Sequence, residues 1–212
     1  MHLEAILWDN DGVLVDTERL YFEATARTLA RVGFSLSRED YIQTSLTDGK
    51  SLFDLVEVDQ DQHEALRNER NELYSELLRD GDLTIPGARE TLTALKDRVR
   101  MIVVTSSRRD HFQIIHHSTG FLSYFEGVVD NEDYERSKPH PDPYRLGLER
   151  LGLGPDVCIA VEDSARGMQA AVSAGLRCTV VPSELTRDAD FSDAYRVLDR
   201  IEDVVGVVDE LM

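Results

Sequence analysis

The sequence predicts an α/β protein whose parallel sheet is interrupted, soon after its first strand, by a helical insertion. Apolar runs of strand length alternate with helical periodicity from about residue 100 onward, which is typical of βαβ units and a parallel sheet. A further run of this kind stands alone at residues 3–8. Between the two regions, residues 17–85 have apolar side chains at helical spacing and no strong strand pattern.

The predicted strands are short apolar runs separated by amphipathic helices. The strands are expected at residues 3–8, 101–104, 127–129, 157–161 and 178–181. The helices of the same region are expected at residues 88–96, 110–119, 143–151, 165–174 and 201–211. His116 and His117 lie within the second of these helices and are expected on its surface.

The insertion is predicted to consist of helices only. They are expected directly after Asp16, at a capping-box pattern formed by Ser37 and Asp40, and at residues 51–56 and 62–79. Pro86-Gly87 marks the return to the pattern of strands and helices. We therefore assign residues 1–16 and 86–212 to a core domain and residues 17–85 to an inserted helical domain. The insertion leaves the sheet where a lid over a site would be placed.

The charge of the chain argues against two classes of partner. Its 41 acidic and 23 basic residues give a net charge of −18, which does not suit nucleic acid or an anionic membrane. An anionic small molecule is compatible, because a bound cation inverts the local field. No apolar run approaches the roughly 18 residues that span a bilayer, and the N-terminus lacks a secretory pattern. We expect a cytoplasmic monomer or weak homo-oligomer, and the acidic excess leaves adaptation to high salt open.

Two carboxylates stand where the first strand ends. Asp9 and Asp11 follow the apolar run directly, and Gly12 then permits unusual backbone angles or a close approach to the chain. Ligands of open α/β sheets gather just beyond the carboxyl ends of the strands. Paired acids at this edge suit the binding of a divalent cation and an attack on phosphorus.

Later strands carry further polar groups to the same edge. Thr105-Ser106 follow the second strand, Lys138 follows the third, and Glu162-Asp163 follow the fourth. Hydroxyl and backbone N–H groups bind phosphate oxygens, and several carboxylates in one crevice need a cation, for which oxygen ligands favour Mg²⁺. Each group alone has an ordinary explanation, namely a turn, a strand end, a surface lysine or a helix cap. Their order on successive strands argues for one site.

These residues resemble the four motifs of the haloacid dehalogenase-like hydrolase superfamily. Asp9-Asn10-Asp11-Gly12-Val13-Leu14-Val15-Asp16 resembles the first motif, Thr105 the second, Lys138-Pro139 the third and Glu162-Asp163-Ser164 the fourth. The resemblance implies a Rossmann-like core with a small helical cap. The last two motifs look most like the branch that contains β-phosphoglucomutases and small sugar-phosphate phosphatases.

The resemblance also implies a reaction. Asp9 would attack phosphorus to form an aspartyl-phosphate, while Asp11 would protonate the leaving oxygen and then activate water. Lys138 would stabilise the transferring phosphoryl group, which Thr105 and the Ser106 N–H would grip.

A magnesium ion is the cofactor that the resemblance implies. It would be held by a carboxylate oxygen of Asp9, the backbone carbonyl of Asp11 and the carboxylate of Asp163, with Glu162 assisting. The ion would neutralise charge between the anionic nucleophile and the anionic substrate.

The substrate expected from these motifs is a small phosphorylated metabolite, most simply a sugar phosphate. β-Phosphoglucomutases have a His at the position matching Tyr21, so we favour a phosphatase over an intramolecular phosphomutase. A binding or regulatory protein on the same scaffold is a further alternative, although the nucleophile and metal ligands are retained. Lys50, in a polar break between helices of the insertion, is the candidate for substrate selection.

Overall fold

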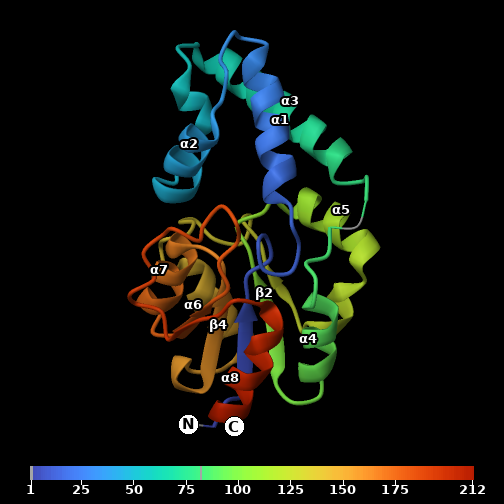
Figure 1. Cartoon of the computed structure of the whole chain (residues 1–212), viewed down its shortest axis with the longest axis vertical. Helices are drawn as coiled ribbons and strands as arrows, with labels where there is room; N and C mark the ends of the chain where they lie inside the picture. The colour runs from blue at the N-terminus through green and yellow to red at the C-terminus, as the bar shows by residue number, and fades with distance from the viewer. Residues whose placement is uncertain (1, 82) are drawn as a thin grey trace. The chain divides into compact units, whose positions relative to one another are not determined.

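The computed structural model describes residues 2–81 and 83–212. The chain forms two compact units (Figure 1). One unit combines the chain up to residue 16 with residues 83–212, and the other begins at residue 17 and ends before Leu83. The assignment of the second unit as a substrate-selecting cap stays a prediction.

The first unit contains a six-stranded sheet in which every pair of neighbouring strands is parallel. The strands are β1 (Ala5–Trp8), β2 (Arg100–Val104), β3 (Val128–Val129), β4 (Cys158–Glu162), β5 (Arg177–Val180) and β6 (Arg196–Val197). Their order in the sheet is β3-β2-β1-β4-β5-β6. The four residues of β1 are fully buried between β2 and β4, as the continuous apolar run requires. The predicted α/β class with a parallel sheet is confirmed.

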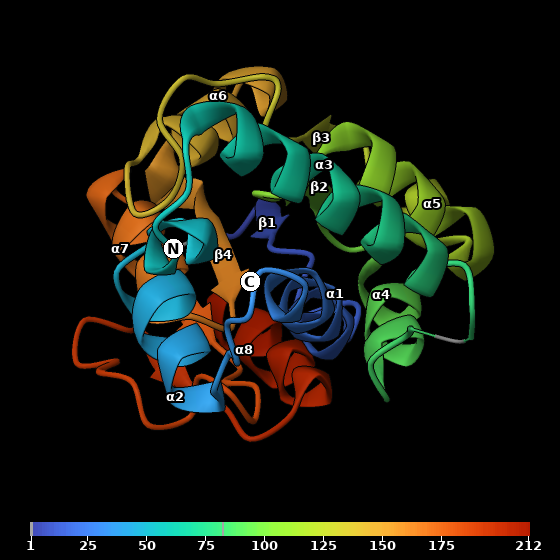
Figure 2. The ribbon, with the colours of Figure 1, turned by 90° about the horizontal axis from the view of Figure 1, so that it is seen from above.

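Helices cover both faces of this sheet (Figure 1 and Figure 2). They are α4 (Ala88–Leu95), α5 (Arg109–Thr119), α6 (Asp142–Leu151), α7 (Ala165–Ser173) and α8 (Val204–Leu211). α6 and α7 pack together on one face, and α4, α5 and α8 lie on the other. α6 packs closely because it presents Gly147, where a Cβ atom would lie 2.8 Å from Leu7 Cδ2.

The structure differs from the sequence prediction at short elements. The helix predicted over residues 201–211 begins as a 3₁₀ turn, Ile201–Asp203, before α8. Two further 3₁₀ turns occupy Phe121–Tyr124 and Pro155–Val157. β6 was not predicted, because its two residues are both exposed and carry no apolar pattern. A single helical turn, or an exposed two-residue strand such as β6, buries too little apolar surface to leave a periodic pattern in the sequence.

The second unit is helical over its described residues, 17–81. Its segments are α1 (Glu18–Ala30), α2 (Arg38–Tyr41), a π-helical turn (Ile42–Thr47), a 3₁₀ turn (Leu52–Leu55) and α3 (Gln60–Leu77). α1 packs against α3, where Tyr21 and Tyr74 meet edge to face with ring centroids 5.3 Å apart. The capping box of Ser37 and Asp40 is formed as predicted. α3 begins two residues earlier than expected, because Asp59 caps it.

The chain leaves and re-enters the first unit at one place. The Asp16 N–H donates to the Leu83 carbonyl at 2.8 Å, and the Ile85 N–H donates to the Leu14 carbonyl at 3.1 Å. Val15 and Thr84 form an antiparallel bridge between these two bonds. The departing and returning segments therefore run side by side directly after the loop that carries Asp11 and Gly12.

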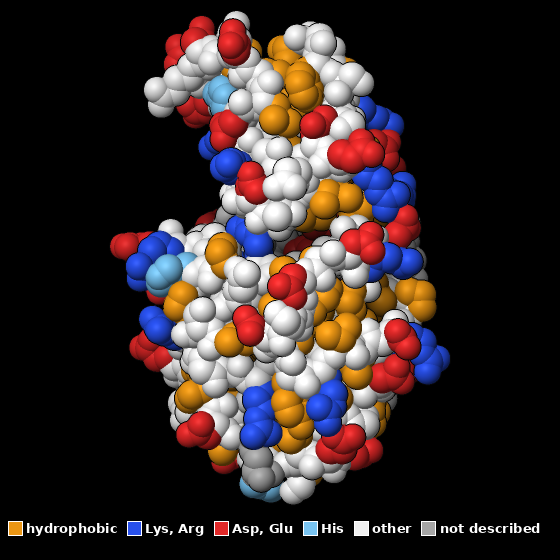
Figure 3. Space-filling view, turned by 60° about the vertical axis from the view of Figure 1, so that its left-hand side comes forward, with side chains coloured by type: hydrophobic (Ala, Val, Ile, Leu, Met, Phe, Trp, Pro, Cys, Tyr) orange, Lys and Arg blue, Asp and Glu red, His pale blue; other side chains and the backbone are white. Residues whose placement is uncertain are grey.

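The surface mixes charges of both signs. On the face drawn in Figure 3, acidic and basic side chains are interspersed with scattered hydrophobic ones. Arginines pair with neighbouring carboxylates, as where Arg100 meets Glu126 through two hydrogen bonds of 2.8 and 2.7 Å. Exposed pairs of this kind stabilise a protein by about 0–1 kcal/mol each. Among the described residues, no helix has the length and apolar character needed to cross a membrane.

Candidate active site

The register of the sheet fixes the place of Asp9. Trp8 at the end of β1 pairs with Val103 of β2 and Val161 of β4. Asp9, the next residue, therefore lies at the carboxyl edge of the sheet, between β2 and β4. The Asp9 N–H donates to the Val161 carbonyl at 2.9 Å, and its side chain is buried. Asp9 is thereby level with Glu162, the last residue of β4.

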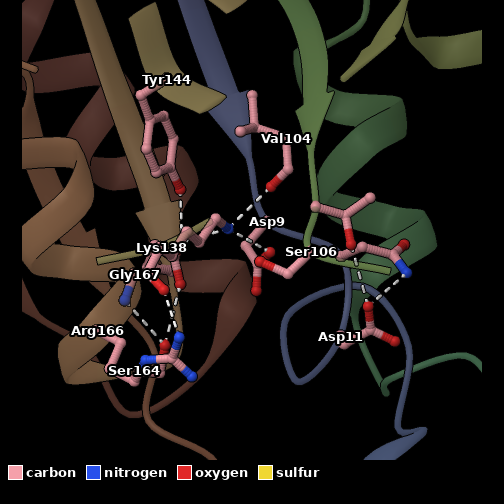
Figure 4. Close-up of polar contacts among 12 residues, drawn as sticks. Asp9, Asp11, Val104, Ser106, Lys138, Tyr144, Ser164, Arg166 and Gly167 are labelled. Carbon is pink, nitrogen blue, oxygen red and sulfur yellow. Dashed lines mark hydrogen bonds and ion pairs between the residues drawn. The ribbon is translucent and has the colours of Figure 1, made fainter. Parts of the chain in front are cut away.

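Lys138 binds both of these carboxylates. Its Nζ atom lies 2.7 Å from Asp9 Oδ1, 2.7 Å from Glu162 Oε1 and 2.9 Å from the Val104 carbonyl oxygen (Figure 4). These three acceptors match the three protons of an ammonium group. Lys138 is only 6% exposed, which rules out its description as a solvated surface lysine. Burial lowers the pKa of Lys138, but Asp9 and Glu162 more than offset that effect and the pKa is raised.

Glu162 is completely buried beneath this contact. Its Oε1 atom also accepts a 2.6 Å hydrogen bond from the Tyr144 hydroxyl, and its Oε2 atom lies 3.4 Å from Ser164 Oγ. A Cβ atom on Gly167 would lie 1.9 Å from Glu162 Oε2, so the first turn of α7 has room for this carboxylate only because residue 167 is glycine. Neither Tyr144 nor Gly167 was predicted as a site residue. A glycine inside a predicted helix is the feature that marks such a close approach.

Three carboxylates form a compact acidic group. Oxygen atoms of Asp9, Glu162 and Asp163, all buried, lie within 4.8 Å of one another. Gly12 allows this approach, because its φ is +83° and a Cβ atom there would lie 2.3 Å from Asp163 Oδ2. The oxygen-only donor set fits Mg²⁺ better than a metal that prefers nitrogen or sulfur.

The electrostatics of the acidic group also favour a cation. Burial and the neighbouring Glu162 carboxylate raise the pKa of Asp9 to about 8, although Lys138 acts in the opposite direction. Lys138 pairs with only two of the three carboxylates, Asp9 and Glu162, which leaves an excess of negative charge if all three are ionised. A divalent ion at this place would favour the ionised form of Asp9.

Asp11 lies apart from the acidic group (Figure 4). Its Oδ2 atom accepts hydrogen bonds from Ser107 Oγ at 2.6 Å, from Thr105 Oγ1 at 3.2 Å and from Asn10 Nδ2 at 3.2 Å. Thr105 Oγ1 in turn accepts from the Ser107 N–H at 3.0 Å. The structure therefore joins Asp11 to the loop after β2, whereas Asp9 is joined to β4 and Lys138.

Two other predicted residues have different surroundings. Ser106 Oγ lies 3.2 Å from Ser137 Oγ, which places the loop after β2 against the residue before Lys138. Lys50 belongs to the second unit, where its exposed ammonium group pairs with Asp48 at 3.0 Å. The part that Lys50 plays in substrate selection stays a prediction.

The surface location predicted for His116 is wrong. His116 is 3% exposed, and its Nε2 atom lies 2.7 Å from Asn10 Oδ1, directly beside the paired acids. The side chain occupies the buried stripe of α5 together with Phe112, Ile115 and Thr119. Phe112 and Thr119 lie four residues before and three residues after His116, and this spacing indicated that His116 is on the buried face of the helix. The polar character of histidine obscured that indication. His117, the next residue, is exposed as predicted.

His116 should make stability depend on pH. Burial lowers its pKa from 6.5 to about 4, although Asp11 acts in the opposite direction. The unfolded chain therefore binds a proton between these values that the folded protein does not, and stability falls as the pH falls. We expect wild type to lose about 2–3 kcal/mol more than His116→Gln between pH 8 and pH 4.5.

Urea unfolding at the two pH values measures this difference. The variant His117→Gln is the matched control, because it removes an exposed imidazole from the same helix, and it should follow wild type. Equal pH dependence of wild type and His116→Gln would contradict the prediction.

Comparison with known proteins identifies the family. Residues 6–181 match the family model described as haloacid dehalogenase-like hydrolase. The chain is 31% identical to protein CbbY of Rhodobacter capsulatus over the full length of both, and 31% identical to a phosphorylated carbohydrates phosphatase of Thermotoga maritima over 82% of each. A crystal structure of CbbY from Rhodobacter sphaeroides in complex with phosphate superposes with a TM-score of 0.85 at 28% identity, covering 98% of this chain and 99% of the other. A second CbbY structure contains xylulose-(1,5)bisphosphate.

The chain therefore belongs to the haloacid dehalogenase-like hydrolases and is a phosphatase of that family. Within the family it falls in the branch of CbbY, β-phosphoglucomutase and the sugar phosphatases, as the sequence motifs predicted.

Proposed function

We propose that this protein is a Mg²⁺-dependent phosphomonoesterase that hydrolyses a small sugar phosphate through an aspartyl-phosphate on Asp9. The observation that carries the proposal is the buried contact of Asp9 with Lys138, beside an acidic group suited to a cation. A relative that acts on phosphorylated carbohydrates, and CbbY structures with phosphate and with a sugar bisphosphate, support a substrate of this class.

Asp9 is the nucleophile in the proposed reaction. One of its carboxylate oxygens forms a bond to phosphorus while the bond from phosphorus to the sugar oxygen breaks. Lys138, held by Asp9 and Glu162, adds positive charge where the phosphoryl group transfers. Thr105 and the Ser106 N–H are proposed to hold the phosphoryl oxygens. Asp9, Asp163 and the Asp11 carbonyl, with Glu162 assisting, would hold Mg²⁺, which would supply positive charge that offsets repulsion between nucleophile and substrate.

Asp11 moves the protons. Its carboxylic acid gives a proton to the departing sugar oxygen, and the resulting carboxylate then takes a proton from the water that attacks the aspartyl-phosphate. The second step breaks the bond between phosphorus and Asp9, which returns the enzyme and releases phosphate.

The surroundings of Tyr21 bear on the alternative of a mutase. The ring of Tyr21, at the position where β-phosphoglucomutases have a His, packs against Tyr74 and under the Arg70 guanidinium, whose carbon lies 4.3 Å from the ring centroid. This ring is thus used in packing within the unit.

Phosphate release from a panel of sugar monophosphates, sugar bisphosphates and nucleotides tests the proposal. We expect Mg²⁺-dependent release that chelation reduces to background, with sugar phosphates preferred. Asp9→Asn should lower activity at least about 10³-fold, while Asp156→Asn, on an exposed turn of the same unit, should not change it. Activity retained by Asp9→Asn would exclude the proposed nucleophile. Interconversion of sugar phosphates that needs a bisphosphate primer would instead indicate a mutase, and absence of turnover would indicate a binding protein.

A further inference from the structure

A buried chain of hydrogen bonds runs from Asp11 away from the acidic group and into α5. Asn10 Nδ2 lies 3.2 Å from Asp11 Oδ2, and Asn10 Oδ1 lies 2.7 Å from His116 Nε2. His116 Nδ1 lies 2.8 Å from Thr119 Oγ1, which accepts a 3.2 Å hydrogen bond from the Phe121 N–H. The chain links the paired acids to the end of a helix about a hundred residues later.

The donors and acceptors allow only one direction of hydrogen bonding along this series of side chains. The Asp11 carboxylate accepts three hydrogen bonds at Oδ2, so the Asn10 amide turns its nitrogen to Asp11 and its oxygen to His116. His116 must then donate from Nε2, which leaves Nδ1 to accept from the Thr119 hydroxyl. Burial keeps the imidazole neutral at ordinary pH, because it lowers the pKa of His116 to about 4. Every group in the chain is satisfied in this arrangement.

The surroundings of the chain fix its geometry. Asn10 is fully buried and His116 nearly so, and the imidazole is flanked by the rings of Phe112 and Phe121 at centroid distances of 4.3 and 6.2 Å. A buried polar group costs about 1–3 kcal/mol when it lacks a partner. A leucine pair of similar size would avoid that risk, so packing alone does not require polar side chains here. A fully satisfied polar network does specify one arrangement of the groups that it joins.

We infer that Asn10 and His116 are positioning residues that hold Asp11 in the orientation needed for proton transfer. The inference rests on the proposed function, because it assigns Asp11 as the acid and base. His116 orients the Asn10 amide, and the amide fixes one oxygen of Asp11 together with the hydroxyls of Thr105 and Ser107. A displacement of about 1 Å in a catalytic group can slow a reaction about 10²-fold.

The dependence of the rate on the leaving group separates positioning from folding. A sugar oxygen must receive a proton as it departs, whereas p-nitrophenolate departs without one. The specificity constant kcat/KM reports the steps up to cleavage of the substrate, so it excludes the later hydrolysis of the aspartyl-phosphate. Replacing a residue that positions the acid should therefore lower kcat/KM for a sugar phosphate and leave kcat/KM for p-nitrophenyl phosphate nearly unchanged.

The experiment compares three variants at His116 and its neighbour. We expect His116→Leu to lower kcat/KM about 10-fold or more for the preferred sugar phosphate and by less than about twofold for p-nitrophenyl phosphate. His116→Gln retains a donor for Asn10 and should recover most of this loss. His117→Leu makes the same change at the exposed neighbour and should match wild type with both substrates.

A double variant keeps the test valid if His116→Leu folds poorly. Asn10→Leu with His116→Leu replaces both members of a buried pair by apolar groups of similar size, which is close to neutral for stability. It should keep the melting temperature near that of wild type and still show the selective loss with the sugar phosphate. Equal loss with both substrates, or no loss in a folded variant, would overturn the positioning role. Activity that does not depend on Asp9 would overturn the proposed function, and this role with it.

Discussion

Lys138→Met is expected to abolish phosphatase activity and to lower the free energy of unfolding by about 3–5 kcal/mol at neutral pH. Lys138 is the buried cation that directly contacts Asp9 and Glu162, and methionine preserves the length of its side chain without the charge. Its removal leaves two buried carboxyl groups next to Asp163 without their shared cation, so each must either stay charged and unpaired or take up a proton. Uncompensated charge of this kind is far more costly than the pair that it replaces.

Urea unfolding and phosphate release measure the two effects separately. Lys96→Met, which changes an exposed lysine in the same unit, is the control and should lie within about 0.5 kcal/mol of wild type. Lys138→Met with Glu162→Gln should regain much of the lost stability without regaining activity, because it removes one of the two unpaired charges. Mg²⁺ should stabilise Lys138→Met more than wild type, since it binds the folded state at a carboxylate group that no longer has a cation of its own. A stability of Lys138→Met close to that of wild type would contradict the electrostatic account.

Gly12→Ala is expected to lower Mg²⁺-dependent activity by about 10²-fold or more. The added Cβ atom would lie 2.3 Å from Asp163 Oδ2, so the Asp163 carboxylate must shift from the position that it holds in the acidic group. The backbone contributes a second cost of about 1–3 kcal/mol, because alanine rarely adopts a φ of +83°.

A matched glycine separates these two causes. Gly152 also has a positive φ, +67°, but no atom lies within 4 Å of the position that a Cβ atom would occupy there. Gly152→Ala should therefore share the loss of stability and keep its activity within about twofold. The Mg²⁺ concentration that gives half-maximal activity should rise for Gly12→Ala only. Equal activity of the two variants would show that contact with Asp163 is unimportant.

The sequence predicted the parts of this protein that repeat a simple physical pattern. Continuous apolar runs marked β1, β2 and β4, because the interior residues of a strand buried on both faces are apolar. The groups after those strands could be placed at one edge because parallel strands end on the same side. The structure indeed brings Asp9, Lys138 and Glu162 into contact.

Two of the missed residues, His116 and Tyr144, have hydrogen-bond partners far away in the chain. His116 was predicted to be exposed, and its hydrogen bond with Asn10, two residues after β1, gives its buried ring nitrogen a partner that the local pattern does not reveal. Tyr144 gave no indication of its hydrogen bond with Glu162, because a tyrosine on a helix has the same pattern whether or not its hydroxyl has a partner. Local periodicity tells which face of a helix is buried, but it does not tell which polar atom that face will meet.

The paired segments at Leu14–Asp16 and Leu83–Ile85 have an evolutionary consequence. The two ends of the insertion are hydrogen-bonded to each other. The insertion therefore joins the first unit as one hairpin, and the sheet does not constrain its length. Segments with adjacent ends are the ones that domains tolerate losing, gaining or exchanging. Residues between these ends can therefore change in evolution without any change in the strands on either side of the insertion.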